Sequence, residues 1–357
     1  MQISKVIMHR QDSDITTFVY GSNNTLRFVV TDNLDTPNIE SIFISKITRI
    51  NANNSAFIQY TDNDIGFINL PKKANYQNGS ALITQLTWHG DDSKQAKLRS
   101  EYTLVGKYII YQGTSDKCQI INKSTDNEFT NTLQNKLNHL TGKWVIRSAG
   151  KSSHLEKICL EADKLANITK HIIEISNSSS SVQQIHIGTA NYLRVLRELN
   201  LTDNCEITTN DSSINQELSE LQDIWEIDAI TYNPHLNITY ELASYQKYYE
   251  QNIFTTKNDI KIEYGVVAGI HIFDINSNNS KLSNAQINNT CLDEIYLQIT
   301  LRNLYGIILI DIIKDSGKTE ETKLINKLTT LFKNDISYTK VLGITNGGLL
   351  ELVRNKY

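Results

Sequence analysis

The chain has 357 residues, 39% hydrophobic and 21% charged, which excludes a single small stapled domain and fits two or three globular domains. Its 35 Lys and Arg against 39 Asp and Glu give a net charge of -4, which excludes a uniformly basic coat for nucleic acid but allows a local basic patch. The chain begins without a charged, apolar leader and lacks the roughly 20 consecutive apolar residues of a membrane span, so we expect a cytoplasmic protein with no membrane partner.

The first third of the chain has the alternation of apolar and polar residues that is typical of strands. Up to Pro37 the alternating segments predict a short antiparallel meander: 3–8, 15–20 and 26–30. Five further strand candidates follow: 41–50, 56–60, 65–70, 81–88 and 104–111. Five short strands separated by Asn-, Asp- and Gly-rich turns predict a small barrel of the OB type.

From Leu155 the apolar spacing becomes helical, and the polar run 177–181 after this helix is the best candidate for a linker. The spacing predicts further helices at 192–199, 214–224 and 244–251. An α/β segment should follow, with strands 260–264 and 266–274 joined at Gly265, helix 292–301, strand 307–313, helix 319–332 and strand 338–344. The four cysteines are far apart and form no C-x-x-C pair, so we expect buried free thiols.

Two acidic residues, Asp274 and Asp311, emerge from apolar strands in the last third of the chain. Burying an unpaired carboxylate costs several kcal/mol, so each carboxylate requires a partner. Magnesium is one such partner, since it needs few protein oxygen ligands and keeps water or phosphate in its other positions. The alternative is that each Asp caps the helix or turn after its strand, and spacing alone does not decide between the two.

Three motifs surround these acids: Phe-Asp-Ile-Asn-Ser at 273–277, Leu-Arg-Asn-Leu-Tyr-Gly-Ile-Ile-Leu-Ile-Asp at 301–311, and Gly-Gly-Leu-Leu-Glu-Leu-Val-Arg at 347–354. Together they resemble the catalytic core of the ribonuclease E/G family. In that family an Asp-x-Asn strand end and a second strand-end Asp coordinate Mg²⁺. The resemblance therefore implies that Asp274 and Asp311 are catalytic metal ligands. It also implies that Asn276 orients the metal-bound water or the scissile phosphate.

The barrel segments 42–50, 55–60 and 65–68 are similar to the OB-fold RNA-binding domain of these nucleases. This implies that Phe57 and Phe67 stack on unpaired bases and that Lys94 supplies a basic contact. The alternative is that both rings belong to the barrel core.

The segment 142–150 resembles the family's pocket for an RNA 5′-monophosphate, in which an Arg and a small hydroxyl residue bind the terminal phosphate. Arg147 and Ser148 would take these roles, with Ser148 at a position where relatives usually have Thr. The alternative is that Arg147 pairs with a nearby acid such as Glu156.

The resemblance implies an α+β multidomain fold. An RNase H-like scaffold (1–37 and 182–262) would be interrupted by the OB-fold barrel (38–107) and the 5′-phosphate sensor region (108–181). A DNase I-like α/β catalytic subdomain (263–357) would follow. The sequence stops at Tyr357, before the zinc-binding cysteine motif through which larger relatives pair protomers, so we expect a divergent, short member and leave a homo-oligomer open.

Several positions depart from the family pattern. Ala268 stands where relatives usually carry a Glu, six residues before the first metal-binding Asp, so a carboxylate of the ligand shell is expected to be missing. Lys314, next to Asp315, replaces an acid. Thr290 and Leu297 replace charges expected to face RNA.

Two functions follow from the match and its departures. The first is a metal-dependent endoribonuclease that cleaves single-stranded RNA in RNA processing or decay and favours 5′-monophosphorylated ends. The alternative is a non-catalytic RNA-binding paralogue that keeps the barrel and the end pocket. A nucleotide- or metabolite-binding α/β protein is a remote third reading, because the sequence has no Gly-x-Gly-x-x-Gly or Walker motif.

Overall fold

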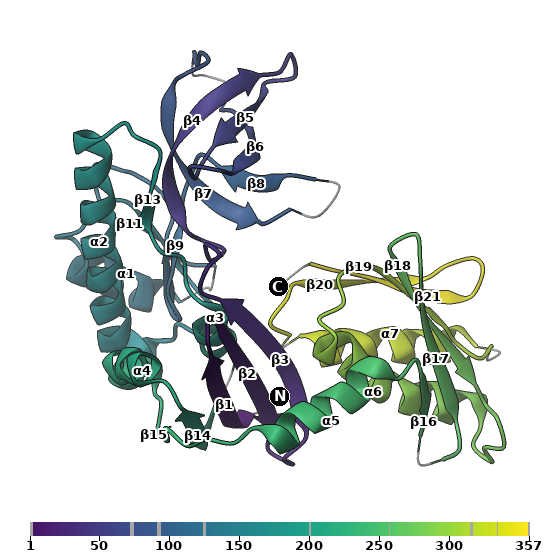
Figure 1. Ribbon diagram of the computed structural model, residues 1–357. Coiled ribbons are helices and arrows are strands. Elements are labelled where there is room, and N and C mark those ends of the chain that lie inside the picture. The colour runs from purple at the N-terminus through teal and green to yellow at the C-terminus, as the bar shows by residue number, and fades with distance from the viewer. Residues whose placement is uncertain are drawn as a thin grey trace. The chain divides into compact units, whose positions relative to one another are not determined.

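The computed structural model describes residues 3–71, 75–90, 94–123, 126–199, 201–256, 258–314, 317–333 and 335–355. Asp315 lies outside these residues. The chain forms two compact units (Figure 1). Unit 1 contains Met1–Thr31, Glu198–Leu218 and Ile227–Tyr357, and unit 2 contains Asp32–Arg197 and Ser219–Glu226. None of the described helices is long and apolar enough to cross a membrane.

The first sheet of unit 1 has the order β15-β14-β1-β2-β3. Its strands are β1 (Ile3–Gln11), β2 (Asp14–Gly21), β3 (Leu26–Asn33), β14 (Leu201–Thr209) and β15 (Ala229–Tyr232). The predicted strands are confirmed, and β14 extends them by pairing with β1 in parallel. Val6, Ile7 and Met8 are all buried in β1, as expected for a central strand covered on both faces.

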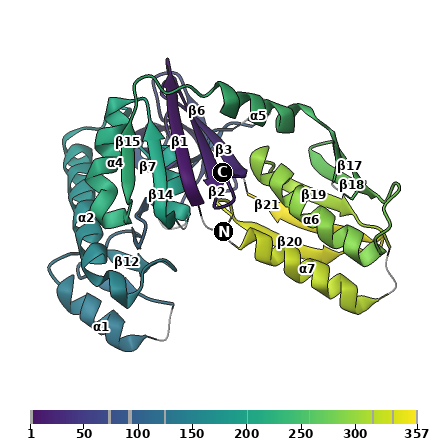
Figure 2. The same cartoon turned by 90° about the horizontal axis from the view of Figure 1, so that it is seen from below.

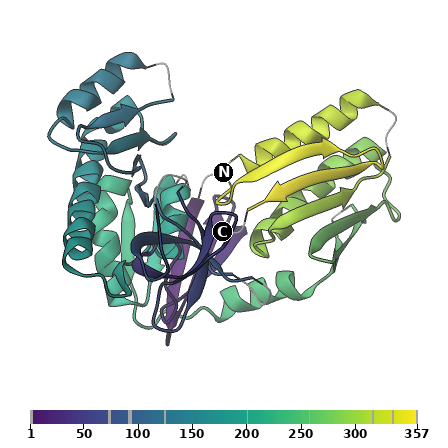
Figure 3. The same cartoon turned by 90° about the horizontal axis from the view of Figure 1, so that it is seen from above.

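The second sheet of unit 1 has the order β16-β17-β18-β19-β21-β20. Its strands are β16 (Ile253–Thr255), β17 (Lys261–Val267), β18 (Ile270–Asn276), β19 (Gly306–Asp311), β20 (Thr339–Ile344) and β21 (Leu349–Arg354). Helices α6 (Asn284–Leu301) and α7 (Lys318–Phe332) lie along one face of this sheet (Figures 2 and 3) and share its apolar core. The structure thus extends the predicted α/β segment by strand β21 and starts α6 eight residues early, at the Ser283 cap.

The turn between β17 and β18 differs from the prediction. We expected the two strands to join at Gly265, but Gly265 lies inside β17 opposite Ile272. The chain turns at Ala268 (φ +51°) and Gly269 (φ +81°), between the paired residues Val267 and Ile270. Two consecutive residues with positive φ are typical of a type I′ hairpin turn, for which Ala is a poor sequence signal.

Unit 2 contains a closed five-stranded barrel, consistent with an OB-like fold. Its strands are β4 (Ile42–Ile50), β5 (Ser55–Gln59), β6 (Ile65–Asn69), β7 (Ala81–Trp88) and β8 (Ala96–Arg99). They pair in the order β4-β5-β6-β8-β7, and β4–β7 pairing closes the barrel. The predicted barrel is confirmed, but the segment predicted as its fifth strand was wrong. The fifth strand is β8, whose four residues give little alternation to detect.

The segment predicted as the fifth strand belongs to a separate sheet of order β11-β12-β10-β9. That sheet contains β9 (Leu104–Val105), β10 (Ile109–Tyr111), β11 (Gln119–Ile121) and β12 (Lys143–Ile146). Strand β13 (Gln183–His186) pairs with β4. The predicted linker run is the end of α2 and its short connection to β13.

The remaining helices are α1 (Asn127–Lys136), α2 (Leu155–Ser178), α3 (Asn191–Glu198), α4 (Ser212–Trp225) and α5 (Thr239–Glu250), with a short 3-10 helix, η1 (Ser152–His154). Helix α2 buries the stripe Ile158, Ala162, Leu165 and Ile172, at the helical spacing seen in the sequence. Cys118, Cys205 and Cys291 are buried free thiols as predicted, and Cys159 is half-buried.

Candidate active site and RNA-binding surfaces

Asp274 and Asp311 are brought together at the carboxyl ends of two neighbouring strands. They are in register on the parallel strands β18 and β19. Their chain neighbours Phe273, Ile275 and Ile310 are buried in the core under the sheet, so the two acids point to the opposite face. Asp274 is half-buried and Asp311 is exposed, and the site is therefore open to a ligand.

Asn276 lies on the same face as Asp274, two residues along β18. Its Nδ2 donates a hydrogen bond to Asp274 Oδ2 at 2.6 Å, which orients that carboxylate. The helix-capping alternative does not hold for the next two helices. The cap of α6 is Ser283, whose side chain accepts from Gln286, and the cap of α7 is Gly317, which has no side chain to accept with.

Glu263 is a third acid at this edge of the sheet, and the sequence interpretation missed it. It pairs with Asp274 across β17 and β18 and therefore shares its face. Its carboxylate is engaged by Lys261 Nζ at 2.5 Å. Within the part of the chain that the structure describes, no three His, Cys, Asp or Glu side chains are grouped to hold one metal ion.

Ala268 does not lie beside these acids. It is in the turn before β18, whereas Asp274 is near the end of that strand. Six residues of strand span about 20 Å, so position 268 is at the far end of the hairpin. The expectation that Ala268 removes a carboxylate from the ligand shell was wrong. Six residues along an extended strand separate the two positions too widely for both to contact one metal ion.

The segment after β19 is held by Asn288 of α6. Asn288 Nδ2 donates to Ile313 O at 2.8 Å, and Ile313 N donates to Asn288 Oδ1 at 3.0 Å. This segment lines a cavity of about 260 Å³ together with Lys314, Glu320, Glu321, Gly347 and Gly348. The backbone of Ile313, two positions past Asp311, is therefore fixed by the buried side-chain amide of Asn288.

Leu297 was expected to replace a charge facing RNA. It is instead buried in a cluster with Ile7, Phe18 and Leu301, between α6 and the first sheet of unit 1. A charge at this place would be buried in an apolar cluster, so Leu297 is a core residue in this chain.

Phe57 and Phe67 pair across β5 and β6, with ring centroids 6.0 Å apart at 71°. Both are half-buried, and neither belongs to the barrel core, which Phe43, Ile47, Ile58, Ile68 and Leu98 help to form. The rings therefore lie on the outer surface, and the core alternative is wrong. Lys94 is exposed two residues before β8.

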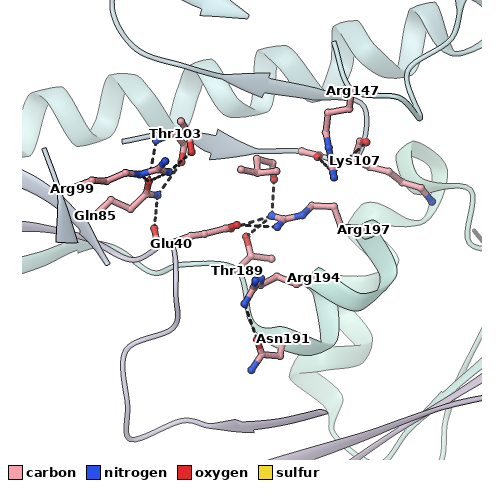
Figure 4. Close-up of polar contacts among 12 residues, drawn as sticks. Glu40, Gln85, Arg99, Thr103, Lys107, Arg147, Thr189, Asn191, Arg194 and Arg197 are labelled. Atoms are coloured by element: carbon pink, nitrogen blue, oxygen red, sulfur yellow. Dashed lines mark hydrogen bonds and ion pairs between the residues drawn. The ribbon is translucent and has the colours of Figure 1, made fainter. Parts of the chain in front are cut away.

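Arg147 follows β12, and its side chain points to the loop before β10 (Figure 4). Its Nη1 donates to Gly106 O at 2.7 Å, and its backbone N–H donates to Tyr108 O at 2.9 Å. Ser148 is exposed in the following turn. Glu156, the acid named in the alternative, accepts from Lys136 Nζ at 2.9 Å.

The loop that Arg147 contacts is anchored by a buried carboxylate that the sequence did not reveal. Glu161 of α2 accepts from the backbone N–H of Lys107 at 2.7 Å and of Tyr108 at 2.8 Å, and from Trp225 Nε1 at 2.9 Å. A Cβ at Gly106 would lie 2.3 Å from Glu161 Cδ, so only glycine fits there. The pattern of α2 indicated an amphipathic helix but not this contact.

A second anchor lies at the approach to the barrel. Arg197 of α3 forms a bidentate ion pair with Glu40 at 3.0 and 2.9 Å and also donates to Val105 O at 3.0 Å (Figure 4). Burial has the largest single effect and raises the pKa of Glu40, but the charge and hydrogen bond of Arg197, together with Arg194 and Thr189, hold that pKa below its ordinary value. The barrel and the sheet of β9 are therefore tied through one buried cation.

The sequence profile of the Ribonuclease E/G family matches residues 103–357. This chain belongs to the ribonuclease E/G family. The matched range contains Asp274, Asn276, Asp311, Arg147 and Ser148, and the resemblance seen in the sequence motifs is confirmed.

Similar proteins of known name agree with this family. The chain is 24% identical to Ribonuclease E of Buchnera aphidicola subsp. Acyrthosiphon pisum, with 88% of this chain and 39% of that protein covered. It is 22% identical to Ribonuclease E of Haemophilus influenzae, with 88% of this chain and 38% of that protein covered. The chain thus spans well under half the length of these relatives.

Proposed function

We propose that this chain is a metal-dependent endoribonuclease that cleaves single-stranded RNA. The observation that carries the proposal is the register of Asp274 and Asp311 on neighbouring parallel strands in a member of the ribonuclease E/G family. The proposed fold assigns 1–37 and 182–262 to an RNase H-like scaffold and 263–357 to a DNase I-like catalytic subdomain, which carries both acids.

The donor set suits Mg²⁺. Two carboxylates on one face supply hard oxygen ligands, and magnesium is commonly held by one or two carboxylates plus water and phosphate. When bound, the ion activates water and neutralises charge on the phosphodiester. Asn276 holds the Asp274 carboxylate in place, and Asn288 fixes the segment after Asp311.

The barrel binds unpaired RNA in this proposal. Phe57 and Phe67 present ring faces to bases, and exposed Lys94 provides a positive charge for the backbone. Stacking of one base on one aromatic ring contributes about 1–3 kcal/mol and tolerates any base. The barrel would therefore select single strands rather than a sequence.

The pocket at Arg147 and Ser148 gives a preference for 5′-monophosphorylated ends. A guanidinium offers parallel charge-assisted hydrogen bonds to a phosphate, and a hydroxyl adds a donor. The carbonyl of Gly106, in the anchored loop, accepts a hydrogen bond from Arg147 Nη1 and so orients the guanidinium. We expect RNA with a 5′-monophosphate to be favoured over RNA with a 5′-hydroxyl.

A non-catalytic RNA-binding paralogue is the second candidate. Lys314 favours it, because this cation lines the cavity beside the end of β19, where relatives carry an acid. A metal titration separates the two candidates: calorimetry with Mg²⁺ or Mn²⁺ should give binding in the wild type that Asp274→Asn abolishes. RNA binding without any metal binding would favour the paralogue.

A further inference from the structure

The outer surface of the barrel carries one continuous row of side chains across all five strands. Successive register pairs join Arg49 of β4 to Phe57 of β5, Phe57 to Phe67 of β6, Phe67 to Lys97 of β8, and Lys97 to Trp88 of β7. Residues in register on neighbouring strands share a face, so the five form an ordered series of basic, aromatic, aromatic, basic and aromatic groups. We call it the barrel row.

The row faces outward. Arg49 and Lys97 are exposed, and the three aromatic residues are half-buried. The residues on either side of them, such as Ala56, Ile58, Ile68 and Leu98, are buried in the core. Lys97 Nζ lies 5.3 Å from the centroid of the Trp88 ring, which joins the last two members by a cation–π contact.

Two bulges bring the end members into the row. The register shifts between Ile47 and Arg49 in β4, and again between Leu86 and Trp88 in β7. In each bulge a threonine is the extra residue. Thr48 Oγ1 donates to Phe57 O at 3.1 Å, and Thr87 Oγ1 donates to Lys97 O at 2.9 Å.

Bulges re-aim a side chain at the expense of a ladder hydrogen bond, and the threonine hydroxyls replace that bond here. The same device at both ends of the row indicates that Arg49 and Trp88 are held on the surface rather than left there by chance. The three half-buried rings and the two cations lie in register on one surface, and contiguous apolar groups rimmed by polar side chains mark interaction sites.

We infer that the barrel row is the path of an unpaired RNA strand, with Trp88 as a third base-stacking residue and Lys97 as a phosphate contact. This inference rests on the proposed function and extends it beyond Phe57, Phe67 and Lys94. The row's two cations and absence of acidic members match a polyanion, and its three rings match exposed bases. In duplex RNA the faces of the bases are covered by the neighbouring base pairs, so they cannot stack on the three rings.

Intrinsic fluorescence tests the inference directly. The chain has three tryptophans; Trp144 is 0% and Trp225 is 5% exposed, which leaves Trp88 as the accessible indole. Titration of an unpaired oligoribonucleotide should quench Trp88 and saturate together with binding measured by anisotropy of a labelled RNA. Trp88→Phe should lose the quenching and keep affinity within about threefold of wild type, since a ring remains to stack.

Trp88→Leu should weaken RNA binding by about 5- to 150-fold, as expected for one lost stack. Lys97→Gln should lower affinity and reduce the slope of log K against log salt by about 0.7, the value for one phosphate on a single strand. Lys170→Gln, a matched change of an exposed lysine on α2, should alter neither quantity. Circular dichroism of each variant should match the wild type.

The outcomes separate this inference from the proposed function. RNA binding that is weakened by Phe57→Ala but not by Trp88→Leu would overturn the extended row and leave the proposed function standing. Equal binding of duplex RNA, or a Trp88 signal that follows protein concentration rather than RNA, would overturn the row as well; the latter would assign it to self-association. No RNA binding by the wild type would contradict both.

Discussion

Unit 2 contains a buried ion pair between Arg197 and Glu40. The Arg197 side chain is 3% exposed and its partner Glu40 18%. Removing one partner of a buried pair leaves the other charge uncompensated, so Arg197→Met should lower the free energy of unfolding by about 3–5 kcal/mol. Lys136→Met breaks the exposed pair with Glu156 and should leave the free energy of unfolding nearly unchanged. Equal losses in urea unfolding would contradict this assignment.

The same pair makes stability depend on pH in a known direction. The pKa of Glu40 is below its ordinary value of 4.5: burial raises it, but Arg197, Arg194 and Thr189 together lower it by more. The unfolded chain binds this proton more readily, so the contribution is complete above pH 4.5 and declines as pH falls through the lower folded pKa. The difference in unfolding free energy between wild type and Glu40→Gln should therefore shrink from pH 7 towards acid. A difference in unfolding free energy that grows towards acid pH would contradict this direction of the Glu40 pKa.

Ala268 holds a backbone conformation that suits glycine, with φ at +51°. A left-handed conformation costs a non-glycine residue about 1–2 kcal/mol, so Ala268→Gly should raise the free energy of unfolding by up to about 1 kcal/mol after the entropy of glycine is subtracted. Ala243→Gly, in the exposed part of helix α5, should lower it by about 1 kcal/mol. The same sign for both variants would argue against the turn at 268.

At the scale of elements, the sequence predicted what periodicity controls. Alternation located four of the five barrel strands, and helical spacing located α2 and α7. It could not locate β8, which is only four residues long, or the bulges that place Arg49 and Trp88 on the surface, since a bulge leaves the composition unchanged. Glu263 was missed because its neighbour in space is set by the hairpin register and not by sequence distance.

The connection after β19 is held in place by a side chain of helix α6. Asn288 is 1% exposed and satisfies both backbone groups of Ile313. Asn288→Leu leaves those groups buried without partners, so it should lower the free energy of unfolding by about 1–3 kcal/mol. It should also weaken Mg²⁺ binding, because the strand end that carries Asp311 loses its support. Exposed Asn289→Ala is the control; an equal effect of the two changes would refute the role of Asn288.

At the scale of the whole molecule, the family match covers residues 103–357, while the chain spans 39% or less of its named relatives. Cleavage of RNAs that differ only at the 5′ end tests the proposed phosphate-binding role of Arg147. Cleavage of RNA with a 5′-monophosphate should exceed cleavage of the same RNA with a 5′-hydroxyl, and Arg147→Ala should erase the difference without changing the slower rate. Arg147→Lys, which keeps the charge but not the paired donors, should retain only part of the preference.

The central claim is that Asp274 and Asp311 support metal-dependent cleavage. Its most direct test is the rate at which wild type and Asp311→Asn cut a short 5′-monophosphorylated single-stranded RNA in Mg²⁺, with RNA affinity measured in parallel. Asp293→Asn, an exposed acid on α6, serves as the matched control. We predict that Asp311→Asn loses cleavage and keeps RNA affinity and folding, while Asp293→Asn cleaves at the wild-type rate. Cleavage by Asp311→Asn at the wild-type rate, or none by the wild type with Mg²⁺, would contradict the assignment.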